Sequence, residues 1–289
     1  MAAYKAFAIA GGINSSGPMS GNLGSFFAKS LLKQGASVTL LVRSIGKPEV
    51  AEDLKQRGAT IKIIDYNEPE SLAEALVGID VVISTLSGPG FAVQPALAKA
   101  SKQAGVSLFV PSEFGTATLG VEPDSPIYGK AKFHGVLKEL ELPYTLFFTG
   151  VFSDFARMIF NTSTGKITII GRGDAKVSTT ARQDIADYLA FVLTKLKPEE
   201  LANRVLRIEG SRFSFNELVE HANANSQRPL EVDHEPLQVA QKRYADTHDF
   251  ITWMKVAWDQ GRGVSATNTS DLDNHLFPDW QPKPIKDFL

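Results

Sequence analysis

The sequence predicts an α/β protein with a doubly wound parallel sheet and a smaller C-terminal α/β lobe. Two observations support this prediction. Short apolar segments of strand length alternate with segments of helix length through the first half of the chain. A glycine-rich stretch, AGGINSSGPMSGNLGS at 10–25, directly follows the first apolar segment. Rossmann-type folds place a ligand-binding turn at this point, after the first strand.

The first strand–loop–helix–strand unit is complete within the N-terminal part of the chain. Residues 5–11 form an apolar run without alternation, which is typical of a strand buried on both faces. Residues 24–35 carry apolar side chains at helical spacing and end at Gly35, a residue that commonly terminates helices. Residues 37–43 are then predicted to form the second strand.

The alternation continues to about residue 152, with further helices at 48–58, 68–78, 92–105 and 125–142 and further strands at 60–66 and 80–86. Residues 107–115 are expected to form a strand that runs into a loop, and residues 143–152 a sixth strand and its exit. Beyond this point, short strands at 166–171 and 204–210 mix with helices at 182–196 and 214–226. We therefore expect a first domain over 1–152 and a smaller lobe over 153–289, some elements of which can return to the first domain.

Composition excludes several classes of protein. The net charge of −2 gives no basis for binding a polyanion such as nucleic acid. The chain has no cysteine, and its five histidines lack metal-binding spacing. The N-terminus lacks the features of a signal peptide, and no apolar run reaches the roughly 18 residues of a membrane span. A cytoplasmic protein is expected, either monomer or homodimer.

The glycines of 10–25 become regular if one insertion is assumed. Gly11 and Gly12 are followed by eight residues and then by GNLG at 21–24. Reducing those eight residues to one gives a GxxGxxG string, the fingerprint of a dinucleotide-binding turn. The expected cofactor contacts are Gly11, Gly12, Gly21, Asn22, Leu23 and Gly24.

Three of these glycines have distinct expected roles. Gly11 makes the turn out of the first strand, Gly21 lies against the pyrophosphate, and Gly24 lets the helix pack close to the sheet. The polar insertion is tolerated at low entropic cost. It could cover the pyrophosphate with hydroxyl groups, or it could displace the loop and abolish binding. Alternatively, the glycines only form a flexible hairpin.

Basic residues at the end of the second strand indicate which dinucleotide binds. Arg43 and Lys47 follow this strand, and residues 37–48 contain no acidic residue. NAD sites place an acidic residue there for the ribose hydroxyls, whereas a basic residue accommodates the 2′-phosphate of NADP(H). NADP(H) is therefore the expected cofactor, although two solvated basic side chains are the simpler alternative.

The hexapeptide VPSEFG at 110–115 resembles a hallmark of the isoflavone reductase-like and NmrA-like branch of the atypical short-chain dehydrogenases. Further segments carry the same resemblance, namely GG…GNLG, LVR, K…ELPYT, GVF, QDIA, LRIEG…FSFNEL and FPDWQPKPIKDFL. The resemblance implies a Rossmann domain that binds NADPH and a lobe that shapes the substrate pocket. It also implies reduction of phenylpropanoid-type compounds such as isoflavones, lignans and benzylic ethers.

The resemblance also implies residue roles. Counting back from PYT, the family's lysine on the helix after the fifth strand falls on Lys130. Ser112, Glu113 and Phe114 lie in the loop on the cofactor side, with Glu113 expected to be a structural acid. The segment after the fourth strand is expected to follow the ribose and phosphates through backbone contacts, at Thr85, Leu86 and Ser87.

A second lysine competes for the catalytic role. Tyr128 and Lys132 form the Tyr-x-x-x-Lys pattern of other short-chain dehydrogenases, and residues four apart share a helix face. Lys130 and Lys132 point about 160° apart around a helix, so both cannot face the cofactor. The PYT register favours Lys130. A lysine of lowered pKa could transfer a proton while hydride adds to carbon, and a charged lysine could stabilise an oxyanion.

Aromatic residues after the fifth and sixth strands are candidates for substrate binding. Phe114, Gly150, Phe152 and Phe155 lie where the strand ends converge, and phenylalanines there could stack on a flat apolar substrate. Ordinary core packing is the simpler interpretation of each phenylalanine. Trp253, Met254 and Trp258 lie on an expected helix, where they line the pocket or pack the lobe.

Together these features predict an NADPH-dependent reductase of a small aromatic or conjugated carbonyl compound of phenylpropanoid type. The nicotinamide would supply the hydride, and Lys130 would act as acid and base. The alternative is a non-catalytic regulator that senses NADP(H) and acts through protein partners.

Overall fold

The computed structural model describes residues 3–13, 23–160, 165–224 and 229–289. Contacts divide the chain into two compact units. The first unit comprises Met1–Glu113, Thr118–Phe147 and Ile185–Leu206, and the second comprises Phe114–Ala117, Phe148–Asp184 and Arg207–Leu289. The expected boundary after residue 152 lies within a segment of the second unit, and the chain returns to the first unit at Ile185. The domain organisation given by the sequence stays a prediction at this level.

The first unit is built on a five-stranded parallel sheet in the order β3-β2-β1-β4-β5. Its strands are β1 (Ala6–Ala10), β2 (Ser37–Val42), β3 (Thr60–Ile63), β4 (Val81–Ser84) and β5 (Leu108–Val110). The order reverses direction between β1 and β4, which makes this a doubly wound sheet with its switch point there. The Rossmann-type fold class expected from the sequence is confirmed.

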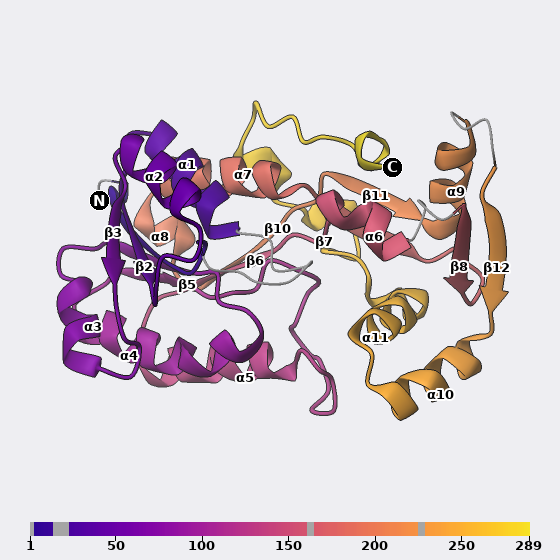
Figure 1. Ribbon diagram of the computed structural model, residues 1–289, viewed down its shortest axis with the longest axis horizontal. Helices are drawn as coiled ribbons and strands as arrows, with labels where there is room; N and C mark the ends of the chain where they lie inside the picture. Colours follow the sequence, from indigo (N-terminus) through magenta and orange to yellow (C-terminus); the bar gives the residue numbers. More distant parts are fainter. Residues whose placement is uncertain (1–2, 14–22, 161–164, 225–228) are drawn as a thin grey trace. The chain divides into compact units, whose positions relative to one another are not determined.

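Five helices of the first unit follow the expected alternation: α1 (Leu23–Lys33), α2 (Pro48–Gln56), α3 (Pro69–Ala75), α4 (Gln94–Gln103) and α5 (Tyr128–Glu139). Figure 1 shows α1 and α2 on one side of the sheet and α3, α4 and α5 on the other. A 3₁₀ turn at Gly88–Val93 precedes α4. Proline lies in the first turn of α2, α3 and α4, where its missing N–H has no helical partner to lose.

One face of this sheet packs against α3, α4 and α5. Small residues of β1, Ala8 and Ala10, are fully buried there and leave room for the larger side chains of the helices. Leu97 of α4 and Leu137 of α5 are also fully buried in this cluster. Phe109 of β5 lies 5.9 Å from Phe133 of α5, measured between ring centroids. This packing fixes α5 beneath the end of β5.

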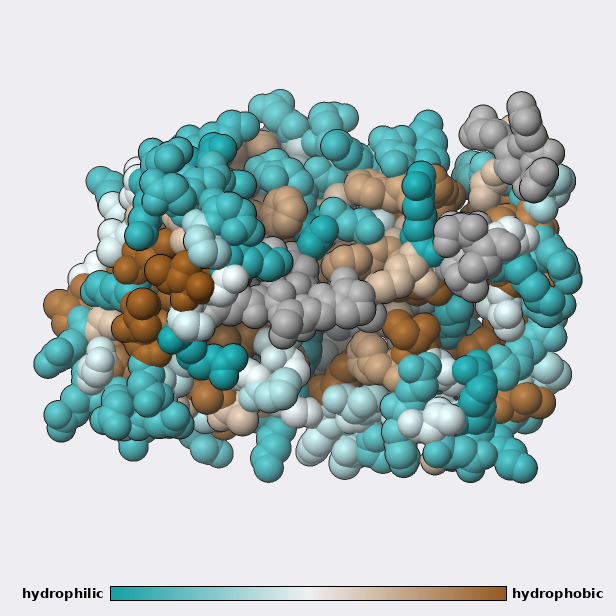
Figure 2. Space-filling view, in the orientation of Figure 1, coloured by the Kyte–Doolittle hydropathy of each residue, from teal (hydrophilic) through white to brown (hydrophobic). Residues whose placement is uncertain are grey.

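The outer strand of the sheet is less covered. Ile63 of β3 is 65% exposed, and none of the four residues of this strand is buried. Figure 2 shows a largely hydrophilic face in which hydrophobic side chains gather in the region of β2 and β3. The edge position of β3 explains this exposure, because an edge strand has a neighbour on one side only.

The sixth predicted strand and its exit form two separate strands in the structure. Residues 143–152 form β6 (Thr145–Phe148) and β7 (Val151–Phe152), which belong to different sheets. β6 lies beside β5 through a parallel bridge between Phe109 and Tyr144, and it pairs with β10 (Arg204–Arg207). Gly150 separates the two strands with a positive φ of 67°, a conformation that L side chains rarely adopt.

The second unit contains two small sheets. One has the order β11-β9-β7 and is formed with β9 (Lys176–Thr180) and β11 (Ser211–Ser214). The other pairs β8 (Lys166–Ile170) with β12 (Glu231–Glu235) in parallel. Its helices are α6 (Ala156–Phe160), α9 (Phe215–Ala224), α10 (Leu237–Thr247) and α11 (Phe250–Ala257). α7 (Arg182–Lys195) begins in this unit and, like α8 (Pro198–Leu201), mostly belongs to the first.

The two tryptophans and the methionine expected on one helix are core residues. Trp253, Met254 and Trp258 are 9%, 7% and 1% exposed. The indole of Trp258 packs against the ring of Phe215 with a centroid distance of 5.9 Å. Of the two interpretations left open by the sequence, the structure therefore supports packing of the second unit.

Candidate functional site

The turn after β1 is formed by two glycines in conformations reserved for glycine. Gly11 has a φ of 98° and Gly12 a φ of 102°. A Cβ atom at Gly12 would lie 2.9 Å from the Cα of Gly24, closer than real Cβ contacts allow. The N-terminus of α1 therefore packs directly against the end of β1, which agrees with the packing role expected of Gly24.

A threonine at the end of β4 closes the same turn. The backbone N–H and the side-chain hydroxyl of Thr85 both donate to the Ala10 carbonyl, each at 2.9 Å. A Cβ atom added at Gly11 or at Gly24 would lie 2.8 Å from the Thr85 Oγ1. This close approach brings the carboxyl ends of β1 and β4, the expected cofactor contacts Gly11 and Thr85, and the start of α1 together. Leu86 is half-buried and Ser87 exposed beyond this point.

The expected 2′-phosphate residues lie at the same edge of the sheet. Arg43 directly follows β2 and is exposed, and Lys47 is half-buried at the start of α2. Residues 14–22, which include Gly21, Asn22 and most of the inserted segment, lie outside the described residues. Leu23, the first residue of α1, is buried at 8% exposure. The cofactor roles of all these residues stay predictions.

Lys130 lies in the first turn of α5 with its amine directed to the end of β5. Its Nζ donates to the backbone carbonyl of Glu113 at 2.6 Å. The amine also lies 5.5 Å from the centroid of the Phe91 ring. Burial lowers the pKa of the Lys130 amine from its usual value, and the charge of Glu113 opposes this shift. An amine whose pKa is lowered gives up its proton more readily than an ordinary lysine, which suits it to proton transfer.

The Glu113 side chain is buried at 2% exposure and is held at both oxygens. Its Oε2 accepts from the Thr118 hydroxyl at 3.0 Å, and its Oε1 lies 2.7 Å from Nε2 of His134. The His134 ring in turn stacks on Tyr144 with a centroid distance of 6.5 Å. The structural role expected of Glu113 agrees with these contacts.

The rival lysine is placed differently. Lys132 is exposed, whereas Tyr128 is half-buried at the first position of α5. The two lysines thus project from different sides of the helix, as the 3.6-residue period requires. Lys130, and not Lys132, reaches the end of β5. The structure favours the register derived from PYT, while the catalytic role itself stays a prediction.

Several residues near Lys130 were not expected from the sequence. Gln94, at 3% exposure, accepts the backbone N–H of Ser112 at 3.1 Å and so fixes the start of the loop after β5. Phe91 shields the Lys130 amine, and His134 binds Glu113. The Lys130–His134 spacing of four residues was a usable signal, because such residues share one face of a helix. Phe91 and Gln94 gave no comparable signal.

Comparisons with known proteins agree with this arrangement. The family model described as the NmrA-like family matches residues 18–289. The chain belongs to the NmrA-like family.

Individual proteins with related sequences match most of the chain. The isoflavone reductase homologue P3 of Arabidopsis thaliana is 32% identical, with 75% of each chain covered. A phenylcoumaran benzylic ether reductase of Ginkgo biloba is 30% identical, with 78% of this chain and 79% of that protein covered. The resemblance inferred from PSEFG and its accompanying segments is therefore confirmed.

A solved structure shows the same fold. The complex of leucoanthocyanidin reductase with NADPH from Vitis vinifera superposes with a TM-score of 0.83 at 21% identity, with 97% of each chain covered. This likeness extends over both units of the NmrA-like chain and supports the fold assigned above.

The residues expected to bind substrate lie in the second unit. Phe114 is buried at 6% exposure and has a positive φ of 32°, which is unusual for a residue other than glycine and typical of functional loops. Phe152 and Phe155 are half-buried with ring centroids 6.0 Å apart. The Arg182 guanidinium lies 4.8 Å from the Phe155 ring. A Cβ at Gly150 would collide with the Ser178 carbonyl, so packing requires a glycine there, and its contact with substrate stays a prediction.

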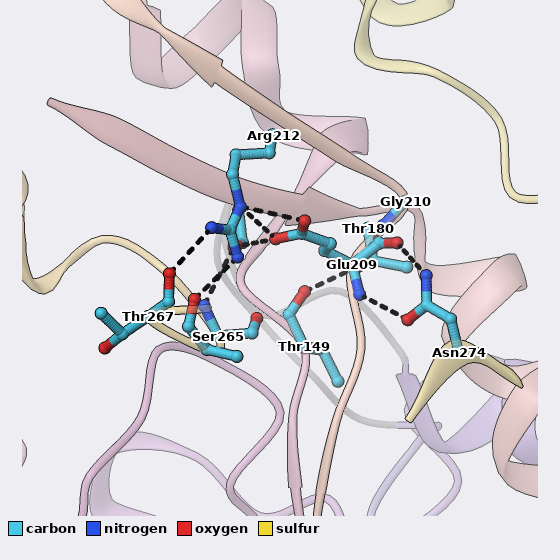
Figure 3. Close-up of polar contacts among 10 residues, drawn as sticks. Thr149, Thr180, Glu209, Gly210, Arg212, Ser265, Thr267 and Asn274 are labelled. Carbon is cyan, nitrogen blue, oxygen red and sulfur yellow. Dashed lines mark hydrogen bonds and ion pairs between the residues drawn. The ribbon is translucent and has the colours of Figure 1, made fainter. Parts of the chain in front are cut away.

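A second buried glutamate organises the polar interior of the second unit (Figure 3). Glu209 accepts from Nε of Arg212 at 3.0 Å and from the Ser178 hydroxyl. Arg212 also donates to the carbonyls of Ala266 and Thr267, at 2.7 and 3.3 Å. Asn274 makes two hydrogen bonds with the backbone of Glu209 (Figure 3). This network attaches the C-terminal segment to β9 and to the turn before β11.

Among the described residues, no group of three or more histidine, aspartate or glutamate side chains is arranged to hold a metal ion. Within the same described residues, none of the helices combines the length and the apolar character needed to cross a membrane.

Proposed function

We propose that this chain is an NADPH-dependent reductase that acts on a small aromatic compound of phenylpropanoid type. Its relatives include a benzylic ether reductase and an isoflavone reductase homologue, and its fold is that of a leucoanthocyanidin reductase in complex with NADPH. The observation that carries the proposal is the Lys130 amine, which is half-buried at the end of β5, has a lowered pKa and is oriented by a backbone carbonyl.

The residues at the carboxyl ends of β1, β2 and β4 fit NADP(H). Gly11, Gly12 and Gly24 let β1, β4 and the start of α1 approach closely. The N-terminus of α1 therefore lies at the carboxyl end of the sheet, where a pyrophosphate binds in this fold. Arg43 would bind the 2′-phosphate, because it follows β2, where the adenosine ribose lies in this fold. When bound, the reduced cofactor supplies a hydride.

Lys130 would then act as the proton donor and acceptor. Phe91 and the end of β5 partly exclude water from its amine, and the Glu113 carbonyl holds one of its N–H groups. In its charged form the amine can donate a proton to a substrate oxygen on which negative charge develops. In its neutral form it can accept a proton from a phenol. Phe152 and Phe155 would contact the aromatic ring of the substrate through their half-buried faces.

The direct test has two stages. Binding is measured by the enhancement and blue shift of NADPH fluorescence, and turnover by NADPH oxidation with quinones, enones, isoflavones, lignans and benzylic ethers. Reduction of one phenylpropanoid-type class supports the proposal. NADPH binding with no oxidation by any compound would instead favour the non-catalytic sensor, and absence of binding would contradict both functions.

A further inference from the structure

Helix α5 contacts Glu113 at two points that lie one helical turn apart. Lys130 donates to the backbone carbonyl of Glu113 at 2.6 Å, and Nε2 of His134 lies 2.7 Å from its carboxylate. The two helical residues are separated by four positions and therefore share a face. Glu113 itself follows the last strand of the main sheet, after Val110 and Pro111. One residue thus connects the end of β5 with the catalytic face of α5.

Every part of Glu113 that can hydrogen-bond is used in this connection. Its backbone N–H donates to the Pro111 carbonyl at 2.8 Å, and its second carboxylate oxygen accepts from Thr118 at 3.0 Å. The side chain is almost completely buried, so each lost partner would leave a polar atom without water to replace it. The Glu113 carbonyl that accepts from Lys130 is therefore held in place by the backbone N–H and by the side chain of the same residue.

We propose that Glu113 is a positioning residue for the reaction, and that His134 completes it: together they fix the carbonyl that orients the Lys130 amine. This inference rests on the proposed role of Lys130 as proton donor and acceptor. Neither residue touches substrate in this proposal. Glu113 acts through the direction of one N–H bond and through its negative charge near the amine.

The chemical consequence follows from the geometry of an amine. A neutral lysine amine carries two N–H bonds and one lone pair at tetrahedral angles. When one N–H is fixed on the Glu113 carbonyl, the lone pair and the remaining hydrogen are confined to a narrow range of directions. Proton transfer is sensitive to such alignment, and small misplacements can lower the rate by about 100-fold. The carboxylate of Glu113 additionally favours the charged amine and so opposes the effect of burial.

The test uses four variants of the full chain. Glu113→Gln removes the negative charge and keeps the size of the side chain. His134→Phe keeps a ring to stack on Tyr144 and removes the hydrogen-bond partner of Glu113, whereas His134→Gln restores a donor. Glu139→Gln is the matched control, because it removes one negative charge from an exposed position of the same helix. Circular dichroism and the NADPH dissociation constant establish that each variant is folded.

Two measurements are made on each variant. The first is kcat at saturating NADPH and substrate across pH. The second is the titration of the Lys130 Cε–H resonances by NMR, assigned with Lys130→Arg, which requires no substrate. We expect Glu113→Gln to lower the titration midpoint of Lys130 and to move the corresponding limb of the pH profile to lower pH. We expect kcat to fall about 10- to 100-fold in Glu113→Gln and His134→Phe, with substantial recovery in His134→Gln.

The outcomes separate this inference from the proposed function. If the Lys130 titration is the same in Glu113→Gln and Glu139→Gln, or if kcat stays within twofold of the parent in both Glu113→Gln and His134→Phe, Glu113 is not a positioning residue. Such results would leave an active reductase intact. A parent protein that oxidises NADPH with no compound would end the proposed function, and the titration would still decide whether Glu113 controls the Lys130 amine.

Discussion

Two buried glutamates, Glu113 in the first unit and Glu209 in the second, are surrounded by different kinds of partner. Both are nearly inaccessible, at 2% and 8% exposure. Glu209 faces Arg212, a cation that stays charged at every relevant pH, and the guanidinium continues to two backbone carbonyls. Glu113 faces His134 and Thr118, and its own carbonyl receives the amine of Lys130.

This difference in partners separates a site that stabilises the fold from a candidate site for proton transfer. Around Glu209 the cation is a guanidinium that stays charged, and the network holds the C-terminal segment through Arg212 and Asn274 (Figure 3). Around Glu113 the network includes a half-buried amine whose pKa is lowered by burial. Groups with shifted pKa values are enriched at functional sites, and here the shift coincides with the end of a central parallel strand.

The largest expected effect concerns the amine itself. Lys130→Ala removes the proton donor and acceptor and should lower kcat about 100- to 10,000-fold, the range that general acid–base catalysis contributes. Steady-state turnover at saturating NADPH measures this loss. Lys132→Ala removes an exposed lysine from the same helix and should retain most of the turnover. A loss of rate in Lys132→Ala alone would reverse the assignment of the two lysines.

The second effect tests whether the Glu209 network stabilises the second unit. Arg212→Met leaves the Glu209 carboxylate buried without its cation and should lower the free energy of unfolding by about 3–5 kcal/mol. Urea denaturation monitored by circular dichroism measures this change. Arg172→Met breaks an exposed ion pair with Asp174 in the same unit and should leave stability unchanged within error. Equal stability of the two variants would show that the Glu209 network contributes little.

The third effect tests whether the first unit binds NADP(H), as the chemical interpretation of Glu113 requires. Arg43→Ala should weaken NADPH binding about 10- to 100-fold, because one charge-assisted hydrogen bond to the 2′-phosphate is lost. NADH lacks that phosphate, so its dissociation constant should change little. Fluorescence titration of the parent and the variant with both cofactors provides the measurement. Equal losses for NADPH and NADH would argue against contact between Arg43 and the 2′-phosphate.

The smallest effect is a pH dependence of stability. Because the pKa of Lys130 is lowered in the folded protein, the unfolded chain binds more protons between that lowered value and the ordinary lysine value of 10.5. The free energy of unfolding of the parent should therefore rise with pH through this window. Lys130→Met lacks the titrating group, so the parent should gain stability relative to this variant as pH approaches 10.5. A pH-independent difference between them would mean that burial does not perturb this amine.

Much of the fold and part of the candidate site could be predicted from the sequence. The alternation of apolar runs and helical segments predicted the doubly wound sheet, and the family resemblance at PYT pointed to Lys130. The same patterns did not indicate that the exit of the sixth strand forms β7 in another sheet. At this point Gly150 packs closely against the Ser178 carbonyl, a contact between segments remote in sequence.

The sequence by itself determined the sheet, the glycine turn at Gly11 and Gly12, and the family, because these depend on hydrophobic period and on residues adjacent along the chain. Only the tertiary structure decided which partner each buried glutamate has. Glu113 and His134 are 21 residues apart, and the nearby Phe91 comes from yet another segment. Their meeting depends on how α5 packs beneath the sheet, and the burial that this packing produces is what lowers the pKa of Lys130.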